Sequence, residues 1–250
     1  MEFFTSLHAH SGVPFSRQFE GIRKGMADAK SDFGIHSAII PGVNRELGPD
    51  KAEEYLDQIL ENNSDDIIGL GLDYFETPFP PEPFADVWAR AKRAGLRLTA
   101  HAGEAGPAQY IEASLDVLNV ERVDHGYNIV DDPALVARCK EMGILFTCCP
   151  STSIGTTPYR DLSAPNHPIR RMNEAGLVVS INSDDPPMFL TDLSREYEIA
   201  FTQLGFSAQD IKRSVLATID HAWVDDSTKK SWRAEWMPEI DRITAELEQI

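Results

Sequence analysis

The chain has 250 residues, with 23 Lys and Arg against 40 Asp and Glu and a formal net charge of -17, and its length suits a single α/β barrel. The acidic balance argues against nucleic acid and anionic membranes as partners, because both favour a basic surface. No stretch of about 18 apolar residues predicts a membrane span, and the opening MEFFTSLHAH lacks the basic and apolar regions of a signal peptide.

Short apolar stretches alternate along the chain with stretches of helical periodicity, which is typical of a parallel sheet built from βα units. From about residue 192 onward the pattern is helical throughout. The predicted strands are Glu2–Thr5, Ser37–Ile40, Ile67–Leu72, Leu96–Ala100, Arg122–Val123, Ile144–Cys148 and Val178–Ile181. The predicted helices before residue 192 are Arg17–Phe33, Ala52–Asn62, Glu82–Gly95, Tyr110–Leu118, Pro133–Met142 and Pro168–Ala175.

The predicted strands number seven, whereas a closed (β/α)8 barrel needs eight. Either one strand escapes the pattern or the barrel is incomplete. We therefore predict an α/β fold of the (β/α)8 TIM-barrel type, incomplete at about seven strands. The expected organisation is a single domain across residues 1–250, with a helical C-terminal segment from about residue 192.

The cysteines predict a reducing environment. The chain has three, Cys139, Cys148 and Cys149, and an odd count with two adjacent residues is not a disulfide framework. A cytoplasmic location therefore fits best.

Polar residues follow several predicted strands at the point where each strand ends. These endings read SLHAH, GLDYFE, HAGE, DHG, CCPSTS and NSDDPP. In a parallel barrel the active site lies at the carboxyl ends of the strands. His, Asp and Glu bind metal ions and transfer protons. One such ending is more often structural, but the set as a whole predicts a catalytic site.

Three of these motifs, TAHAGE, VDHG and NSDDP, occur in an order that resembles the adenosine/adenine deaminase family of metal-dependent amidohydrolases. The resemblance runs from about residue 2 to about residue 225, and GLGLDYFETPFPPEPF is similar to a stretch of the adenine-type members. The resemblance implies hydrolytic deamination of an aminopurine (adenine, adenosine or an N6-modified form) by a metal-activated water. It implies one Zn²⁺ per chain, although sites of N and O ligands accept other divalent metals.

The resemblance also assigns roles to individual residues. His101 and Asp184 are the expected metal ligands, and the metal would lower the pKa of the attacking water. Glu104 is expected to protonate ring N1, and His125 to orient the water. A structural histidine is the alternative for His101, a helix cap or turn for Asp184-Asp185-Pro186, and a glutamate at a helix N-terminus for Glu104.

Substrate contacts are expected from Asp185, facing N7, and from Glu76, at the far edge of the base. Tyr74-Phe75 stands where the adenine-type members usually have Ser-Ser, so a modified purine or another amino-heterocycle stays open as the substrate. The partner is expected to be this small molecule, and the oligomeric state is left open.

Two further histidines of the family's metal site come from an H-x-H at the end of the first barrel strand. The first residues of this chain resemble the second strand, so we expect the first strand to be missing and the chain to be N-terminally truncated. His8-Ala9-His10 has suitable chemistry, because alternate residues of an extended segment point the same way. Its position in SLHAHSGVPF instead matches a loop after the second strand.

Two other functions remain open at this point. One is an inactive fragment that keeps a purine-sized pocket. The other is a related metal-dependent hydrolase that acts on a different C–N bond.

Overall fold

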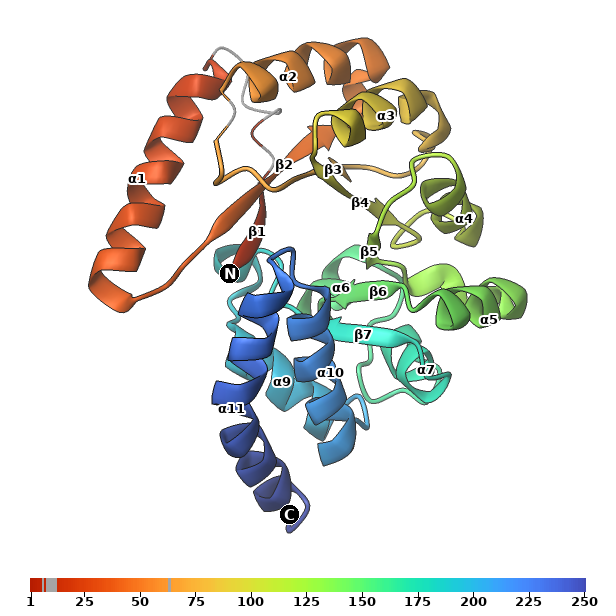
Figure 1. The fold of residues 1–250 in the computed structure, drawn as a ribbon. Helices are drawn as coiled ribbons and strands as arrows, with labels where there is room; N and C mark the ends of the chain where they lie inside the picture. The colour runs from red at the N-terminus through yellow and green to blue at the C-terminus, as the bar shows by residue number, and fades with distance from the viewer. Residues whose placement is uncertain (6, 8–12, 63) are drawn as a thin grey trace. The chain divides into compact units, whose positions relative to one another are not determined.

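A computed structural model describes residues 1–5, 7, 13–62 and 64–250 of the chain (Figure 1). The described chain divides into two compact units. The N-terminal unit comprises Met1–His101 with Glu112–Glu121, and the C-terminal unit comprises Ala102–Ile111 with Arg122–Ile250. The division falls inside one strand and one helix, and the single-domain organisation stays a prediction.

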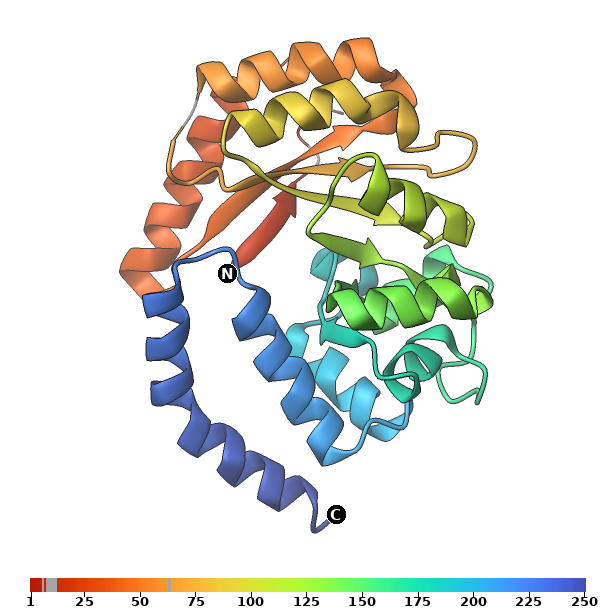
Figure 2. The ribbon, with the colours of Figure 1, turned by 45° about the vertical axis from the view of Figure 1, so that its right-hand side comes forward.

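The N-terminal unit is a parallel sheet with helices between successive strands. Its strands pair in chain order, β1 with β2, β2 with β3 and β3 with β4. The helices α2 and α3 contact each other and lie side by side in Figures 1 and 2. The strands are β1 (Glu2–Thr5), β2 (Ala38–Asn44), β3 (Gly69–Asp73) and β4 (Arg97–Ala102), and the helices are α1 (Phe15–Phe33), α2 (Pro49–Glu61) and α3 (Ala85–Arg93).

The ring of Phe4 in β1 lies so close to β2 and β3 that one position in each of these strands has to be glycine. A Cβ atom on Gly42 of β2 would lie 2.4 Å from the Phe4 ring, and one on Gly71 of β3 would lie 1.9 Å from it. Only glycine therefore lets the Phe4 ring cover these two strands. In the same two strands, Ile39 and Leu70 are fully buried, each with 0% exposure.

The C-terminal unit contains three parallel strands, paired β5 with β6 and β6 with β7. Helix α10 contacts β7 and also α11, so the helical segment after residue 192 packs partly on this sheet (Figure 2). The strands are β5 (Arg122–His125), β6 (Leu145–Cys148) and β7 (Val178–Ile181). The helices are α5 (Pro133–Met142), α6 (Pro150–Thr156), α7 (Pro168–Glu174), α8 (Pro186–Phe189), α9 (Leu193–Thr202), α10 (Ala208–His221) and α11 (Asp226–Leu247), and α4 (Ala108–Asp116) is shared between the units.

The predicted α/β architecture is confirmed: the described residues contain seven strands, and every strand pair named above is parallel. Strands β2, β4 and β5 extend beyond their predicted ends, to Asn44, Ala102 and His125. The short helices α6 and α8 were not predicted. The three cysteines are buried and are not joined in disulfides. Across the described residues, no helix has the length and apolar character that crossing a membrane would require.

Candidate active site

In the N-terminal unit, His101 lies near the end of β4 with its ring held in one orientation. Its Nδ1 is 3.1 Å from the carbonyl oxygen of Leu72 on β3, and the ring of Phe4 meets it edge-on at 5.0 Å between centroids. A carbonyl oxygen can only accept, so this contact places a proton on Nδ1, which in a neutral imidazole leaves the lone pair on Nε2. This is the arrangement that a metal-binding histidine requires. Nε2 also lies 3.9 Å from Oδ1 of Asp73.

A buried arginine holds the backbone around this histidine. Arg45 is only 1% exposed. Its guanidinium donates to the carbonyl oxygens of Asp73 at 3.1 Å, Phe79 at 3.3 Å and His101 at 2.5 Å. Because a buried cation needs hydrogen-bonding partners, these contacts fix the carboxyl ends of β3 and β4 relative to each other.

The other predicted residues of this unit lie in the loop after β3 or outside the described residues. Glu76 is buried, 2% exposed, in the loop after β3, and its carbonyl oxygen accepts from the Phe79 amide at 2.7 Å. Phe75 is 72% exposed. His8 and His10 lie outside the described residues, so the approach of either ring to a metal stays untested.

In the C-terminal unit, the carboxylate of Glu104 faces two other side chains. Its Oε1 accepts from Thr156 Oγ1 at 2.5 Å, and its Oε2 lies 3.8 Å from His125 Nε2. The turn that carries Glu104 is held by Asn128, whose Nδ2 donates to the carbonyl oxygens of Glu104 at 3.4 Å and Gly106 at 2.8 Å. Helix α4 begins only at Ala108. Side chains of other elements therefore orient this carboxylate.

His125 and Asp184 share an unusual backbone conformation. His125 ends β5 with φ 65°, and Asp184 follows β7 with φ 53°. Left-handed conformations cost energy for residues other than glycine and often mark functional positions. Here they accompany an approach of His125 Nε2 to Asp184 Oδ2 of 4.0 Å. Both residues were predicted from sequence, and the structure brings them together with Glu104.

Asp185 also follows β7, directly before α8. It is the N-cap residue of that helix, although its side chain makes no capping hydrogen bond. The helix-cap alternative for Asp184-Asp185-Pro186 therefore describes the backbone but not the carboxylate of Asp185. Its predicted contact with the purine stays a prediction.

Tyr127 connects His125 to the end of β6. The phenol oxygen accepts from the Cys149 amide at 3.0 Å, lies 3.3 Å from the Cys149 carbonyl oxygen and lies 3.2 Å from His125 Nδ1. Burial raises the pKa of the Tyr127 phenol well above its ordinary value, with further contributions from nearby acidic groups. The phenol therefore stays protonated.

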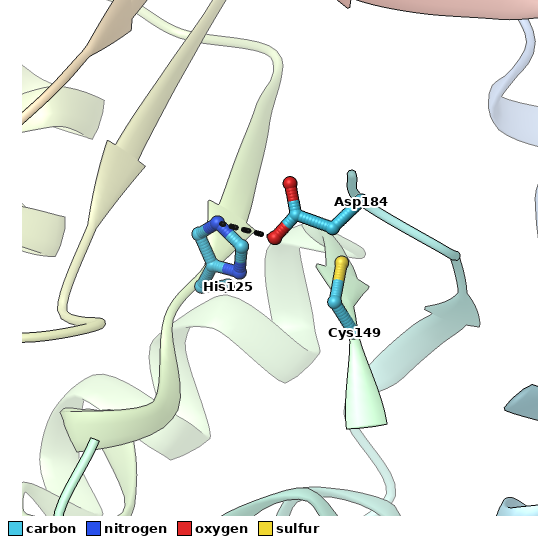
Figure 3. Close-up of side chains that lie close together, drawn as sticks. All are labelled: His125, Cys149 and Asp184. Atoms are coloured by element: carbon cyan, nitrogen blue, oxygen red, sulfur yellow. Dashed lines mark ion pairs between the residues drawn. The ribbon is translucent and has the colours of Figure 1, made fainter. Parts of the chain in front are cut away.

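The ring of His125, the thiol of Cys149 and the carboxylate of Asp184 form a compact cluster (Figure 3). Their ligand atoms all lie within 4.8 Å of one another. Imidazole, sulfur and carboxylate donors suit a borderline divalent metal such as zinc, so the chemistry of these residues fits a metal ion. Burial raises the pKa of the Cys149 thiol well above its ordinary value, and the charge of Asp184 adds to this. Of these three residues, Asp184 is the one that the family resemblance assigns to a metal, and the Cys149 thiol would have to lose its proton before it could bind one.

Sequence reasoning missed four residues of these contacts, namely Arg45, Tyr127, Cys149 and Thr156. Cys149 follows a predicted strand, so strand-end position would have marked it, but its adjacency to Cys148 was used only for redox reasoning. Tyr127 follows VDHG directly and has no signal of its own in a single sequence. Arg45 and Thr156 act through contacts between distant segments.

Parallel strands followed at their carboxyl ends by imidazole and carboxylate groups are typical of enzymes of the TIM-barrel class. The chain belongs to the adenosine deaminase family, whose sequence profile matches residues 1–237. An adenine deaminase of Cupriavidus necator is 36% identical over 241 residues, which cover 96% of this chain and 67% of that protein.

Two solved structures show the same fold. An amidohydrolase from Burkholderia ambifaria with bound Zn has a TM-score of 0.91 and 41% identity, and the match covers 100% of this chain and 70% of that one. An adenine deaminase from Arthrobacter aurescens has a TM-score of 0.90 and 33% identity, and the match covers 96% of this chain and 73% of that one. The chain thus spans about two-thirds of the Cupriavidus protein's length. The barrel-type fold class predicted from the sequence is confirmed.

Proposed function

We propose that the chain catalyses the hydrolytic deamination of an aminopurine, with adenine as the first candidate. The observation that carries the proposal is the convergence of Glu104, His125 and Asp184 at the strand ends of the C-terminal unit, at 3.8 and 4.0 Å from the His125 ring. A carboxyl group, an imidazole and a second carboxylate are groups that can transfer protons during water addition to an aminopurine ring. The named relatives, adenine deaminases of Cupriavidus necator and Arthrobacter aurescens, support adenine.

The residues have distinct roles in this proposal. Glu104 delivers a proton to the purine ring nitrogen as water adds to the neighbouring carbon. The hydrogen bond from Thr156 holds the carboxyl group of Glu104 in place. His125 holds the attacking water through Nε2. A bound divalent metal, zinc in the first instance, would supply Lewis-acid activation of that water. We assign His101 and Asp184 as metal ligands, and the Nε2 lone pair of His101 supports its assignment.

The substrate contacts are assigned to Asp185 and Glu76. The substrate is a small molecule, and we place the protein in the cytoplasm, in agreement with three free thiols. Tyr74 and Phe75 differ from the usual Ser-Ser of adenine-type members, so an N6-modified purine is the second substrate to test.

The test combines turnover with metal content. Purified protein is loaded with zinc, and its metal is quantified after dialysis. Adenine, adenosine and N6-methyladenine are then followed by loss of ultraviolet absorbance and by release of ammonia, or of methylamine in the case of N6-methyladenine. We expect turnover of at least one compound, abolished by Asp184→Asn and unaffected by Asp65→Asn, which changes an exposed carboxylate on a loop.

Two results would decide against deamination. Zinc-loaded protein that leaves all three compounds intact contradicts the proposal and favours the inactive-fragment alternative. Release of a product other than the exocyclic amine, which is ammonia from adenine and adenosine and methylamine from N6-methyladenine, favours a hydrolase of another C–N bond.

A further inference from the structure

We propose that Tyr127 is a positioning residue that fixes both the orientation and the tautomer of His125. The catalytic meaning of this role rests on the proposed deamination, whereas the hydrogen-bonding role can be measured without turnover. The residue lies in the short segment after β5 and is completely buried, with 0% exposure.

Three polar atoms lie within reach of the single hydroxyl group of Tyr127. They are the Cys149 amide nitrogen at 3.0 Å, the Cys149 carbonyl oxygen at 3.3 Å and His125 Nδ1 at 3.2 Å. The two rings are 5.5 Å apart between centroids and tilted by 58°, so the contact runs through the hydroxyl group and not through stacking.

Counting protons selects one arrangement of these contacts. A phenol donates one hydrogen bond and accepts others, an amide only donates and a carbonyl only accepts. If the phenol donates to the Cys149 carbonyl, it accepts from both the Cys149 amide and the Nδ1–H of His125, and all three contacts are satisfied. If it donates to Nδ1 instead, the carbonyl contact is lost. The arrangement that satisfies most contacts therefore places the His125 proton on Nδ1.

This tautomer leaves the lone pair of His125 on Nε2, the atom that faces Glu104 at 3.8 Å and Asp184 at 4.0 Å. An imidazole with its lone pair on this side can accept a hydrogen bond from the attacking water, whereas the other tautomer cannot. Tyr127 also ties His125 at the end of β5 to the main chain of Cys149 just after β6. It therefore holds two strand ends of the site in register.

The test replaces the phenol by Phe in Tyr127→Phe and first measures the protein without substrate or added metal. Imidazole ¹⁵N signals of His125 report the tautomer. We expect the Nδ1–H form in the parent protein and a mixed population in the variant. Hydrogen exchange of the Cys149 amide, which donates to Tyr127, should become at least about tenfold faster, because its partner is gone. Unchanged ¹⁵N signals and exchange would overturn the proposal.

Turnover supplies the catalytic readout. Removing a group that orients a catalytic or ligating histidine costs about 10–100-fold. We expect this loss in kcat, while KM changes by less than about threefold because the phenol does not touch substrate. A KM increase with unchanged kcat would overturn the positioning role. If the parent protein has no deaminase activity, the tautomer and exchange results still decide the hydrogen-bonding role, so the two failures are distinguishable.

A matched control and a milder variant complete the design. Tyr159→Phe removes another phenol beside a histidine, since Tyr159 meets the His167 ring edge-on at 6.0 Å between centroids. It should leave the His125 signals unchanged, and a change would overturn the specificity of the effect. If Tyr127→Phe does not fold, 3-fluorotyrosine at position 127 keeps the shape but weakens the oxygen as an acceptor. It should shift the His125 Nδ1 signal, and an unshifted signal would count against the proposal.

Discussion

The two units of the molecule prepare their polar groups in different ways. In the N-terminal unit, polar side chains contact main-chain atoms: the Arg45 guanidinium donates to three carbonyl oxygens, and His101 Nδ1 faces the Leu72 carbonyl oxygen. In the C-terminal unit, Tyr127 and Asn128 also contact main-chain atoms, but the proposed catalytic side chains face one another. Glu104 lies against Thr156 and His125, and His125 lies against Asp184.

The difference indicates that the two units hold their polar groups for different purposes. Main-chain contacts move only if strands move, so they suit His101, the ring that is proposed to bind a metal. Side-chain contacts adjust when a proton or a substrate arrives, so they suit groups that exchange protons. The main chain at His125 and Asp184 is nevertheless held in place, because a left-handed backbone at such residues persists only where the surrounding structure holds it.

The largest effect is expected in the C-terminal unit. Glu104→Gln keeps the shape and the Thr156 contact but removes the transferable proton, so kcat should fall by about 10²–10⁴-fold. Metal content should stay at the parent level, since Glu104 is not assigned as a ligand. Glu174→Gln, which changes an exposed carboxylate on α7, is the control. A Glu104→Gln variant with parent-like kcat would remove the proton donor from the proposal.

His101→Ala tests the N-terminal unit. Loss of a ligand should weaken zinc binding by more than about 100-fold, since even the loss of a residue that only orients a ligand costs about 10–100-fold. Isothermal titration of zinc into metal-free protein measures this. His36→Ala, which removes an exposed imidazole, should bind zinc as the parent does. Equal zinc affinity in His101→Ala and the parent would assign the metal to His125, Cys149 and Asp184 alone.

The third prediction concerns the packing of Phe4 against Gly71 and Gly42 in the N-terminal unit. Gly71→Ala places a methyl group 1.9 Å from the Phe4 ring, so it should lower the free energy of unfolding by about 2–3 kcal/mol. Gly42→Ala, with a contact of 2.4 Å, should cost less. The control is Gly21→Ala in α1, where nothing lies within 4 Å of the added Cβ. It should raise stability by roughly 0.5–1 kcal/mol in urea unfolding. Equal costs at positions 71 and 21 would show that the Phe4 contact carries no energy.

Local signals predicted much of the fold. Helix α5 has the predicted bounds because Asp132 caps it, Pro133 begins it and Gly143 ends it in a left-handed conformation. Strand β7 likewise matches the prediction. Strand β2 was predicted to stop at Ile40, but it continues to Asn44. Its second half includes Gly42, where an added Cβ would lie 2.4 Å from the Phe4 ring of the neighbouring strand.

Local signals also predicted part of the candidate site. Glu104, His125 and Asp184 occur in motifs, and strand-end position marks them. Tyr127 and Thr156 are recognised only once segments distant in sequence are placed together, since Thr156 contacts a residue 52 positions away. Contacts of this kind cannot be recognised from a single sequence.

The smallest effect concerns a buried histidine of the C-terminal unit that is not assigned to catalysis. His167 has 0% exposure. Its Nε2 lies 3.3 Å from Ser153 Oγ, which itself donates to the Pro150 carbonyl oxygen at 2.6 Å. Nε2–H is therefore the donor, and Nδ1 has no hydrogen-bond partner among the described residues. Burial first, and then the charge of Arg170, lower the pKa of His167 from 6.5 to about 4.

The sign of the pH dependence follows from this lowered pKa. The unfolded chain takes up a proton near pH 6.5, whereas the folded chain resists it until about pH 4. The contribution of His167 to stability is thus complete above pH 6.5 and is lost as the pH falls toward 4. The shift corresponds to at most ~3 kcal/mol, and we expect ~1–2 kcal/mol, because local opening can protonate the ring without complete unfolding.

Urea unfolding of the parent and of His167→Gln, at about pH 7.5 and about pH 4.5, measures this difference. The parent should lose ~1–2 kcal/mol more than the variant between the two conditions, because the variant has no imidazole to protonate. His167→Phe should behave as His167→Gln does, whatever its absolute stability. Identical pH dependence in the parent and both variants would show that His167 is hydrated in the folded protein. Because the contacts of His167 lie in the segments that follow β6, this hydration would indicate a loosely packed C-terminal unit next to Cys149.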